Sequence, residues 1–229
     1  MNRVKGIVKA HLTDLWSWTM LPWLILGFSF AVNLVIGSLV EEVIITGGLT
    51  SIYIYMMVLG IVSLGQTFPF LIGFGARRKD YFLGTAATIS LISAASAVVL
   101  MLLGYVERAT SYWGIDLRFF NVPYVTDGPL AEQFEQFWIF FNAMLHLFFL
   151  GFAIAAVYRK FGRNGLFAVF IVLGLALTVA FYAITHYDRW GSLLSWAQGI
   201  SVLELANGML VLTLLYVVLS YALLRKATT

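Results

Sequence analysis

Cysteine is absent from this 229-residue sequence, and only 11% of its residues are charged. The lack of cysteine excludes disulfide bonds, thiolate metal sites and cysteine nucleophiles. Three histidines are present, at His11, His146 and His186, but they are far apart and form no HxxxH or HExxH pattern. A metalloenzyme is therefore disfavoured, and we expect no metal site in this chain.

A phosphate-binding GxxxxGKS/T loop is also missing, so the chain cannot bind ATP in that manner. The net charge of +3 has a simpler cause than nucleic-acid binding, because most of the cations lie beside apolar segments. We therefore expect membrane lipid and no nucleic acid among the partners.

Apolar residues dominate what is present: 61% of the chain is hydrophobic and the mean hydropathy is +0.91. Soluble domains average roughly 45–50% apolar and 25% charged residues. The composition therefore predicts an all-α integral membrane protein. No linker, low-complexity tract or internal repeat divides the chain, so we expect residues 1–229 to form a single domain.

Six transmembrane helices are expected, at residues 16–40, 51–74, 82–104, 137–157, 166–185 and 201–224. Each is long enough to cross about 30 Å of hydrocarbon at 1.5 Å per residue. Residues 1–15 form an amphipathic pattern of period 3.6, which predicts an interfacial helix. Residues 105–136 are expected to form an ordered external loop on the membrane surface. Residues 186–200 are too apolar for a solvated loop and too short to span, so we expect an interfacial or re-entrant hairpin of short helices.

The positions of lysine and arginine predict the orientation of the chain in the membrane. Eleven of the 14 lie in the segments that this arrangement places inside, and only Arg108, Arg118 and Arg189 lie outside. Because cytoplasmic loops carry an excess of lysine and arginine, both termini are expected to be cytoplasmic. We expect a multi-pass protein of the cell (plasma) membrane.

A few polar residues fall inside the expected spans or the re-entrant segment. Glu204 is the only acid within a span, and two interpretations stay open for it: a structural role, or a role in substrate contact or gating. His146 is more simply a hydrogen-bonded interior histidine than a proton relay. The candidate residues for a substrate pathway or gate are Gln66, Asn142, His146, Trp190, Trp196, Glu204 and Asn207.

The stretch from Gln66 to Gly84 stands out, because a kinked apolar segment with Pro69 meets a short charged turn and a new apolar segment. The sequence FPFLIGFGARRKDYFLGT at residues 68–85, the interfacial helix, the six spans and the re-entrant segment together resemble a permease subunit of the ABC-2 type transporter family. The resemblance covers essentially the whole chain. This sequence departs from the usual Glu-Arg-rich turn of the family and has a longer loop at 105–136.

The resemblance implies that the turn couples the membrane domain to a separate ATPase. The implied coupling residues are Gly75, Arg77, Arg78, Lys79, Asp80, Tyr81 and Phe82. It also implies a second permease chain, two ABC ATPase subunits, and ATP and Mg on those ATPases, with no cofactor and no catalytic residue in this chain. Tyr81 and Phe82 are expected to act as aromatic anchors in an apolar pocket of the ATPase. The simpler interpretation is that the turn is only a cationic topological anchor.

Our hypothesis from the sequence is an exporter permease that forms its pathway as a dimer, in which the small residues Ala86, Ser90 and Ala94 allow close helix packing. One alternative is a non-transporting sensor or immunity protein whose loop at 105–136 binds a ligand outside. A second alternative, an intramembrane enzyme, is disfavoured because no catalytic cluster is apparent.

Overall fold

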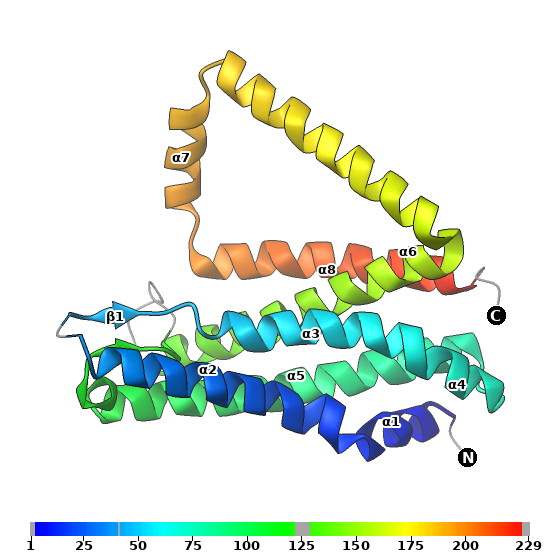
Figure 1. Cartoon of the computed structure of the whole chain (residues 1–229), viewed down its shortest axis with the longest axis horizontal. Helices are drawn as coiled ribbons and strands as arrows, with labels where there is room; N and C mark the ends of the chain where they lie inside the picture. The colour runs from blue at the N-terminus through cyan, green and yellow to red at the C-terminus, as the bar shows by residue number, and fades with distance from the viewer. Residues whose placement is uncertain (1–2, 41, 122–128, 226–229) are drawn as a thin grey trace.

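The computed structural model describes residues 3–40, 42–121 and 129–225 and is almost entirely helical (Figure 1). Its α-helices are α1 (Arg3–Thr13), α2 (Leu21–Gly37), α3 (Thr50–Val62), α4 (Phe68–Gly73), α5 (Arg78–Ala109), α6 (Pro129–His186), α7 (Trp190–Gly199) and α8 (Val202–Arg225). Two π-helical turns, η1 (Trp16–Met20) and η2 (Ser63–Thr67), continue into α2 and α4, and a 3-10 turn, η3 (Tyr112–Gly114), follows α5. The strands β1 (Ile44–Ile45) and β2 (Leu117–Arg118) pair in parallel.

Within the described residues, five helices are long and apolar enough to cross a membrane. They are Trp16–Gly37, Thr50–Gly73, Arg78–Ala109, Glu132–His186 and Val202–Arg225. The prediction of an all-α membrane protein is therefore confirmed. The fourth and fifth predicted spans both fall in α6, whose 58 residues would extend about 87 Å at 1.5 Å per residue. Gly162, with a φ of 69°, breaks the helix inside the predicted turn at 158–164.

Other boundaries also differ from the predicted ones. Helix α5 continues at both ends past the predicted 82–104, and α6 begins at Pro129. The predicted loop 105–136 is therefore limited to residues 110–128, of which 122–128 lie outside the described part of the chain. At 186–200 there is one helix, α7, in place of a hairpin of short helices.

The helices α2, α3, α5, α8 and the first part of α6 lie side by side (Figure 1). Helix α3 packs against α6, and α6 against α8. The closest approach is at Gly60 and Gly151. A Cβ on Gly60 would overlap the carbonyl oxygen of Phe148, and a Cβ on Gly151 would overlap that of Met57. The predicted strip of Ala86, Ser90 and Ala94 is only half-buried.

The second part of α6 leaves this body after Gly162, and α7 returns the chain to the start of α8, so that the three outline a triangle (Figure 1). We call residues 163–199 the arm. Apolar side chains of the arm, including Phe170, Leu177 and Trp196, are more than half exposed. The described chain therefore leaves these apolar side chains without protein cover.

The cationic ends of the helices lie together at one end of the body. Helix α1, the turn between α4 and α5, the break at Gly162 and the end of α8 lie at one end of the body (Figure 1). The strand pair and η3 lie at the other end. The cations that we assigned to one side of the membrane from the sequence, where described, therefore gather at one end of the fold.

Candidate functional site

The charged turn is built on a glycine C-cap. Ala76 N donates to Leu71 O (3.1 Å) and Gly75 N to Ile72 O (2.9 Å), the hydrogen-bond pair of a Schellman motif. Gly75 occupies the left-handed position, with a φ of 84°, which a side chain would strain. Helix α5 then begins at Arg78, so the turn is a sharp reversal and contains no separate coupling helix.

Of the seven expected coupling residues, Tyr81 and Phe82 differ from expectation. Tyr81 is fully buried and Phe82 is 6% exposed, both against other parts of this chain. Their rings therefore stabilise the fold around the turn and are not free to enter a pocket on another protein. Gly75, Arg77 and Lys79 are exposed, and Arg78 and Asp80 are half-buried.

The Tyr81 side chain crosses from α5 to the π-helical turn η2. Its hydroxyl donates to Ser63 O (2.9 Å) and lies 2.8 Å from Thr67 Oγ1. Its ring meets the edge of Phe68 at 5.0 Å between centroids, and the Arg159 guanidinium lies 4.4 Å above the Phe68 ring. The start of α5 is thus joined to the end of α3 and to α6 by buried contacts.

Helix α1 joins the same region through His11, which is 2% exposed. His11 Nε2 lies 2.9 Å from Thr85 Oγ1 on α5, and the imidazole packs 4.5 Å from the Trp18 ring in η1. Burial lowers the pKa of His11 from 6.5 to about 4, and the negative charge of Asp14 opposes part of that shift. The ring is therefore neutral at pH 7.

Two exposed aromatic side chains, one in α4 and one at its C-cap, lie just before the charged turn, and the sequence analysis did not single them out. Phe70 is 62% exposed and Phe74 is 78% exposed, and their rings meet edge to face at 4.8 Å. Phe74 ends α4 directly before Gly75. The available signal was position: an aromatic residue at a helix C-cap lies beyond the packed face of that helix.

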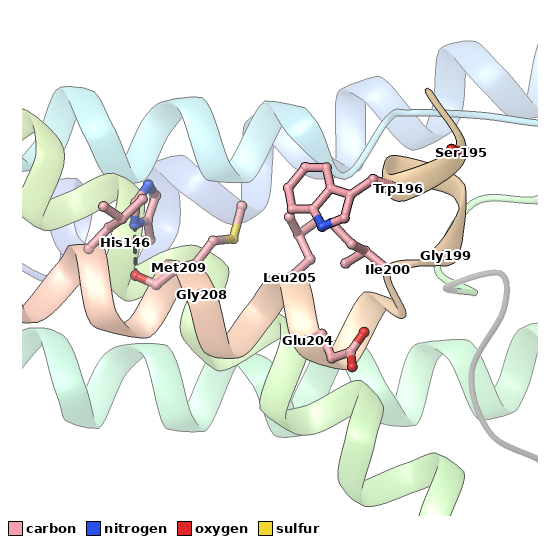
Figure 2. A pocket seen from close by; sticks show the side chains of 10 residues that line it. His146, Ser195, Trp196, Gly199, Ile200, Glu204, Leu205, Gly208 and Met209 are labelled. Atoms are coloured by element: carbon pink, nitrogen blue, oxygen red, sulfur yellow. Dashed lines mark hydrogen bonds between the residues drawn. The ribbon is translucent and has the colours of Figure 1, made fainter. Parts of the chain in front are cut away.

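A cleft of about 930 Å³ lies between α6, α7 and α8. It brings together three predicted pathway residues, His146, Trp196 and Glu204 (Figure 2). The His146 ring comes from α6, Trp196 from α7, and Glu204 from the first turn of α8. Leu205, Met209 and Leu212 give the cleft an apolar wall.

Two further candidates belong to the same helices: Asn142 is buried on α6, and Asn207 is exposed on α8. His146 Nδ1 lies 3.1 Å from Thr213 Oγ1 and 3.2 Å from Met209 O. Asn142 donates to Trp138 O, and Trp138 Nε1 donates to Asn207 Oδ1 at 2.9 Å. The bonds of His146 and Asn207 join α6 to α8, whereas the bond of Asn142 lies within α6.

Glu204 also has a structural role. Its Oε2 accepts a bond from Ser201 N (2.9 Å), and Ser201 Oγ accepts one from Glu204 N (3.2 Å). This reciprocal pair is a capping box at the start of α8. The sequence signal was the S-x-x-E pattern before an apolar run.

Gln66 and Trp190 lie away from the cleft. Gln66 is exposed in η2, near the opposite end of the body. Trp190 begins α7, where its Nε1 donates to Thr185 Oγ1 (3.1 Å) and its ring packs on Phe181. The structure therefore does not unite all seven pathway candidates in one site.

The end of the body opposite the charged turn holds a buried carboxylate that the sequence reasoning had placed in a loop. Glu107 is fully buried near the end of α5. Its oxygens accept bonds from the backbone N–H groups of Phe119, Phe120 and Asn121 and from the Trp113 indole, at 2.9–3.1 Å. The rings of Phe119 and Phe120 pack on Phe30 of α2. We call this arrangement the Glu107 clamp.

No group of three or more His, Asp or Glu side chains in the described ranges is placed to hold a metal ion. Comparisons with family models, curated proteins and solved structures found no match to this chain. The functional assignment therefore rests on the residues and their geometry.

Proposed function

We propose that this chain is the permease subunit of an ATP-driven ABC-type exporter. The observation that carries the proposal is the linkage behind the charged turn: Tyr81 joins the start of α5 to η2, and His11 joins it to α1. A turn that served only as a cationic anchor needs charge and no such linkage. A turn that transmits a push from a partner needs contacts that carry the displacement into several helices.

The proposal includes six membrane crossings, with the Gly162 break dividing α6 into two. Both termini are cytoplasmic in this arrangement, which follows the excess of cations at the end that holds the turn. The chain acts as a dimer with two separate ATPase subunits, and ATP and Mg are bound by those subunits. The protein belongs to the cell membrane.

The cargo pathway is proposed to include the cleft between α6, α7 and α8. Its volume of about 930 Å³ falls within the range of small-molecule sites, which are mostly apolar with a few polar groups. The exposed indole of Trp196 and the carboxylate of Glu204 supply the polar groups near its outer end. An amphipathic cargo fits this lining best.

Partner docking is proposed to use the exposed residues of the turn. Phe74 is the most exposed aromatic side chain there, and Arg77 and Lys79 flank it. A buried aromatic anchor contributes more binding energy than an exposed ion pair, which contributes about 0–1 kcal/mol. Phe74 therefore takes the anchor role that we expected from the sequence for Tyr81 and Phe82.

The test is co-purification with the ABC ATPase encoded nearest to this chain's gene. Phe74→Ala is expected to weaken association and ATPase stimulation more than Lys79→Ala. Phe28→Ala is the matched control, because Phe28 is 74% exposed on α2 and away from the turn. Wild-type association and stimulation in all three variants would reduce the turn to a topological anchor.

The alternative of an external ligand sensor is less well supported. In that alternative the loop at 105–136 binds a ligand outside, which needs accessible side chains in this segment. Phe119 and Phe120 are instead 1% and 3% exposed and belong to the Glu107 clamp.

A further inference from the structure

Two neighbouring clefts run along one face of α5. The first, of about 480 Å³, lies between α1 and α5 and is lined by Lys5, Lys9 and Ala87 among others. The second, of about 360 Å³, continues between α5 and the start of α2, past Trp23 and Val99. Leu12 lines both clefts, so they meet at this residue, and we call the two together the groove.

The two ends of the groove differ in chemistry. At the α1 end, Lys5 and Lys9 are exposed and one helical turn apart, so their ammonium groups lie on the same side of α1. Neither cleft has an acidic side chain in its lining. Asp14, the nearest acid along the chain, accepts a hydrogen bond from Ser17 N (3.2 Å) and does not line the groove.

Away from α1 the lining of the groove is mostly apolar, and its polar members are Thr19 and Ser96. Its floor on α5 includes the small residues Ala87, Ala95 and Ser96. The span from Ala87 to Val99 measures about 18 Å along a helix at 1.5 Å per residue. One leaflet of a bilayer has about half of the 30 Å hydrocarbon thickness. The floor of the groove, which starts at Ala87 in the cleft that the lysines line, therefore has about the length of one acyl chain that enters from the leaflet on which α1 lies.

We propose that this groove binds one anionic phospholipid, with its phosphate at Lys5 and Lys9 and an acyl chain along α5 past Leu12 and Ala95. Charge complementarity selects the headgroup, since lysines at the membrane surface are attracted to anionic lipids. The apolar continuation selects a lipid over a free phosphate ion, which would leave it unfilled. The bound lipid fastens α1 to α5 beside the His11–Thr85 contact.

This site requires only the membrane setting, and its test is independent of any ATPase. The full-length protein is purified in detergent with phosphatidylglycerol or with phosphatidylcholine of the same acyl chains. Native mass spectrometry then counts the retained lipids and gives their relative affinities. The wild-type protein is expected to retain one phosphatidylglycerol in preference to phosphatidylcholine.

Variants separate the two halves of the site. The double variant Lys5→Gln/Lys9→Gln is expected to bind phosphatidylglycerol about tenfold or more weakly. Ala95→Leu fills the apolar part at an exposed position that tolerates a larger side chain, and it is expected to weaken binding while the lysines remain. The control Lys160→Gln/Arg163→Gln removes two cations at the same end of the fold but outside the groove, and it is expected to bind as wild type.

A competition experiment distinguishes binding of the whole lipid from binding of its headgroup alone. Inorganic phosphate and a short-chain phosphatidylglycerol are expected to compete poorly with the long-chain lipid. Equal retention of the two long-chain lipids, or unchanged binding in the Lys5/Lys9 variant, would overturn the proposal. Competition by inorganic phosphate at the same concentration as the lipid would also overturn it, because the acyl chain would then contribute nothing.

Discussion

The Tyr81 hydroxyl donates a hydrogen bond to the carbonyl oxygen of Ser63, 2.9 Å away, and so joins the first turn of α5 to the π-helical turn that ends α3. A π-helical turn has backbone bonds between residues i and i+5, and Ser63 O accepts such a bond from Phe68 N. Thr67 Oγ1 also donates to Ser63 O, at 2.6 Å. Ser63 O therefore keeps two partners, Phe68 N and Thr67 Oγ1, if Tyr81 is changed.

We predict that Tyr81→Phe lowers the free energy of unfolding by about 1 kcal/mol, the net contribution of one hydrogen bond. The loss is small because Thr67 still satisfies Ser63 O. The measurement is thermal unfolding of the purified protein in detergent. Tyr158→Phe is the control, since Tyr158 is 54% exposed, and an equal effect of both changes would contradict the assigned role of Tyr81.

His11 predicts a dependence of stability on pH. Its pKa in the folded protein is about 4, below the ordinary value of 6.5, so the unfolded chain binds the proton more tightly. Stability is therefore highest above pH 6.5, falls as the pH decreases from 6.5 to 4, and loses about 3 kcal/mol in all. Unfolding midpoints measured across this range should fall in the wild type and change much less in His11→Gln. Parallel curves for the two proteins would assign the pH dependence to other groups.

The close approach of α3 and α6 predicts a large effect of a single methyl group. Gly60→Ala or Gly151→Ala places a Cβ against a backbone carbonyl of the facing helix, so the two helices must separate. We expect a loss of about 3 kcal/mol from such overpacking. Gly174→Ala in the arm meets no atom within 4 Å and is expected to be neutral or slightly stabilising. Unfolding of the three variants side by side checks this, and equal stability would place the helix contact elsewhere.

The Glu107 clamp predicts that replacing Glu107 by its neutral isostere, glutamine, lowers the stability of the protein. In Glu107→Gln one of the two oxygens becomes an NH₂ group, which faces donors and cannot accept their bonds. Because the site is fully buried, we expect a cost of about 2–4 kcal/mol. Glu132→Gln breaks the partly exposed pair with Arg108 and is expected to cost no more than about 1 kcal/mol. A Glu107→Gln protein as stable as Glu132→Gln would show that the clamp does not need the charge.

Substitutions at Glu204 distinguish its two interpretations, a structural role and a role in substrate contact or gating. Glutamine also completes a capping box, so Glu204→Gln should keep the stability of the protein, whereas Glu204→Ala should lose about 1 kcal/mol. A transport defect in Glu204→Gln at unchanged stability would assign Glu204 to the cargo pathway. Normal transport would leave it with the cap alone.

The parts of the fold that could be predicted from the sequence are those set by local composition. Apolar runs located the helices that are long enough to cross a membrane, because that signal depends on nearby residues alone, although α5 and α6 extend past the predicted ends. The amphipathic pattern located α1, and the glycine at residue 75 marked the sharp reversal. Each of these features is determined within a few turns of helix.

The rest depends on partners distant in sequence. Glu107 was assigned to a loop because nothing near it shows that four N–H donors converge on its carboxylate. Tyr81 and Phe82 were assigned to a partner because a local pattern cannot show which face of α5 the chain itself covers. The divergence of the arm was likewise beyond prediction, since composition gives the length of a helix and not its direction.

The Glu107 clamp has a mechanical consequence for the helices that it holds. It fixes the far end of α5 to the segment that packs on Phe30 of α2, so these two helices are held together at that end. A rigid helix that is held at one end moves furthest at its other end. Any tilt of α5 relative to α2 is therefore smallest beside Glu107 and largest at Arg78, where the charged turn begins.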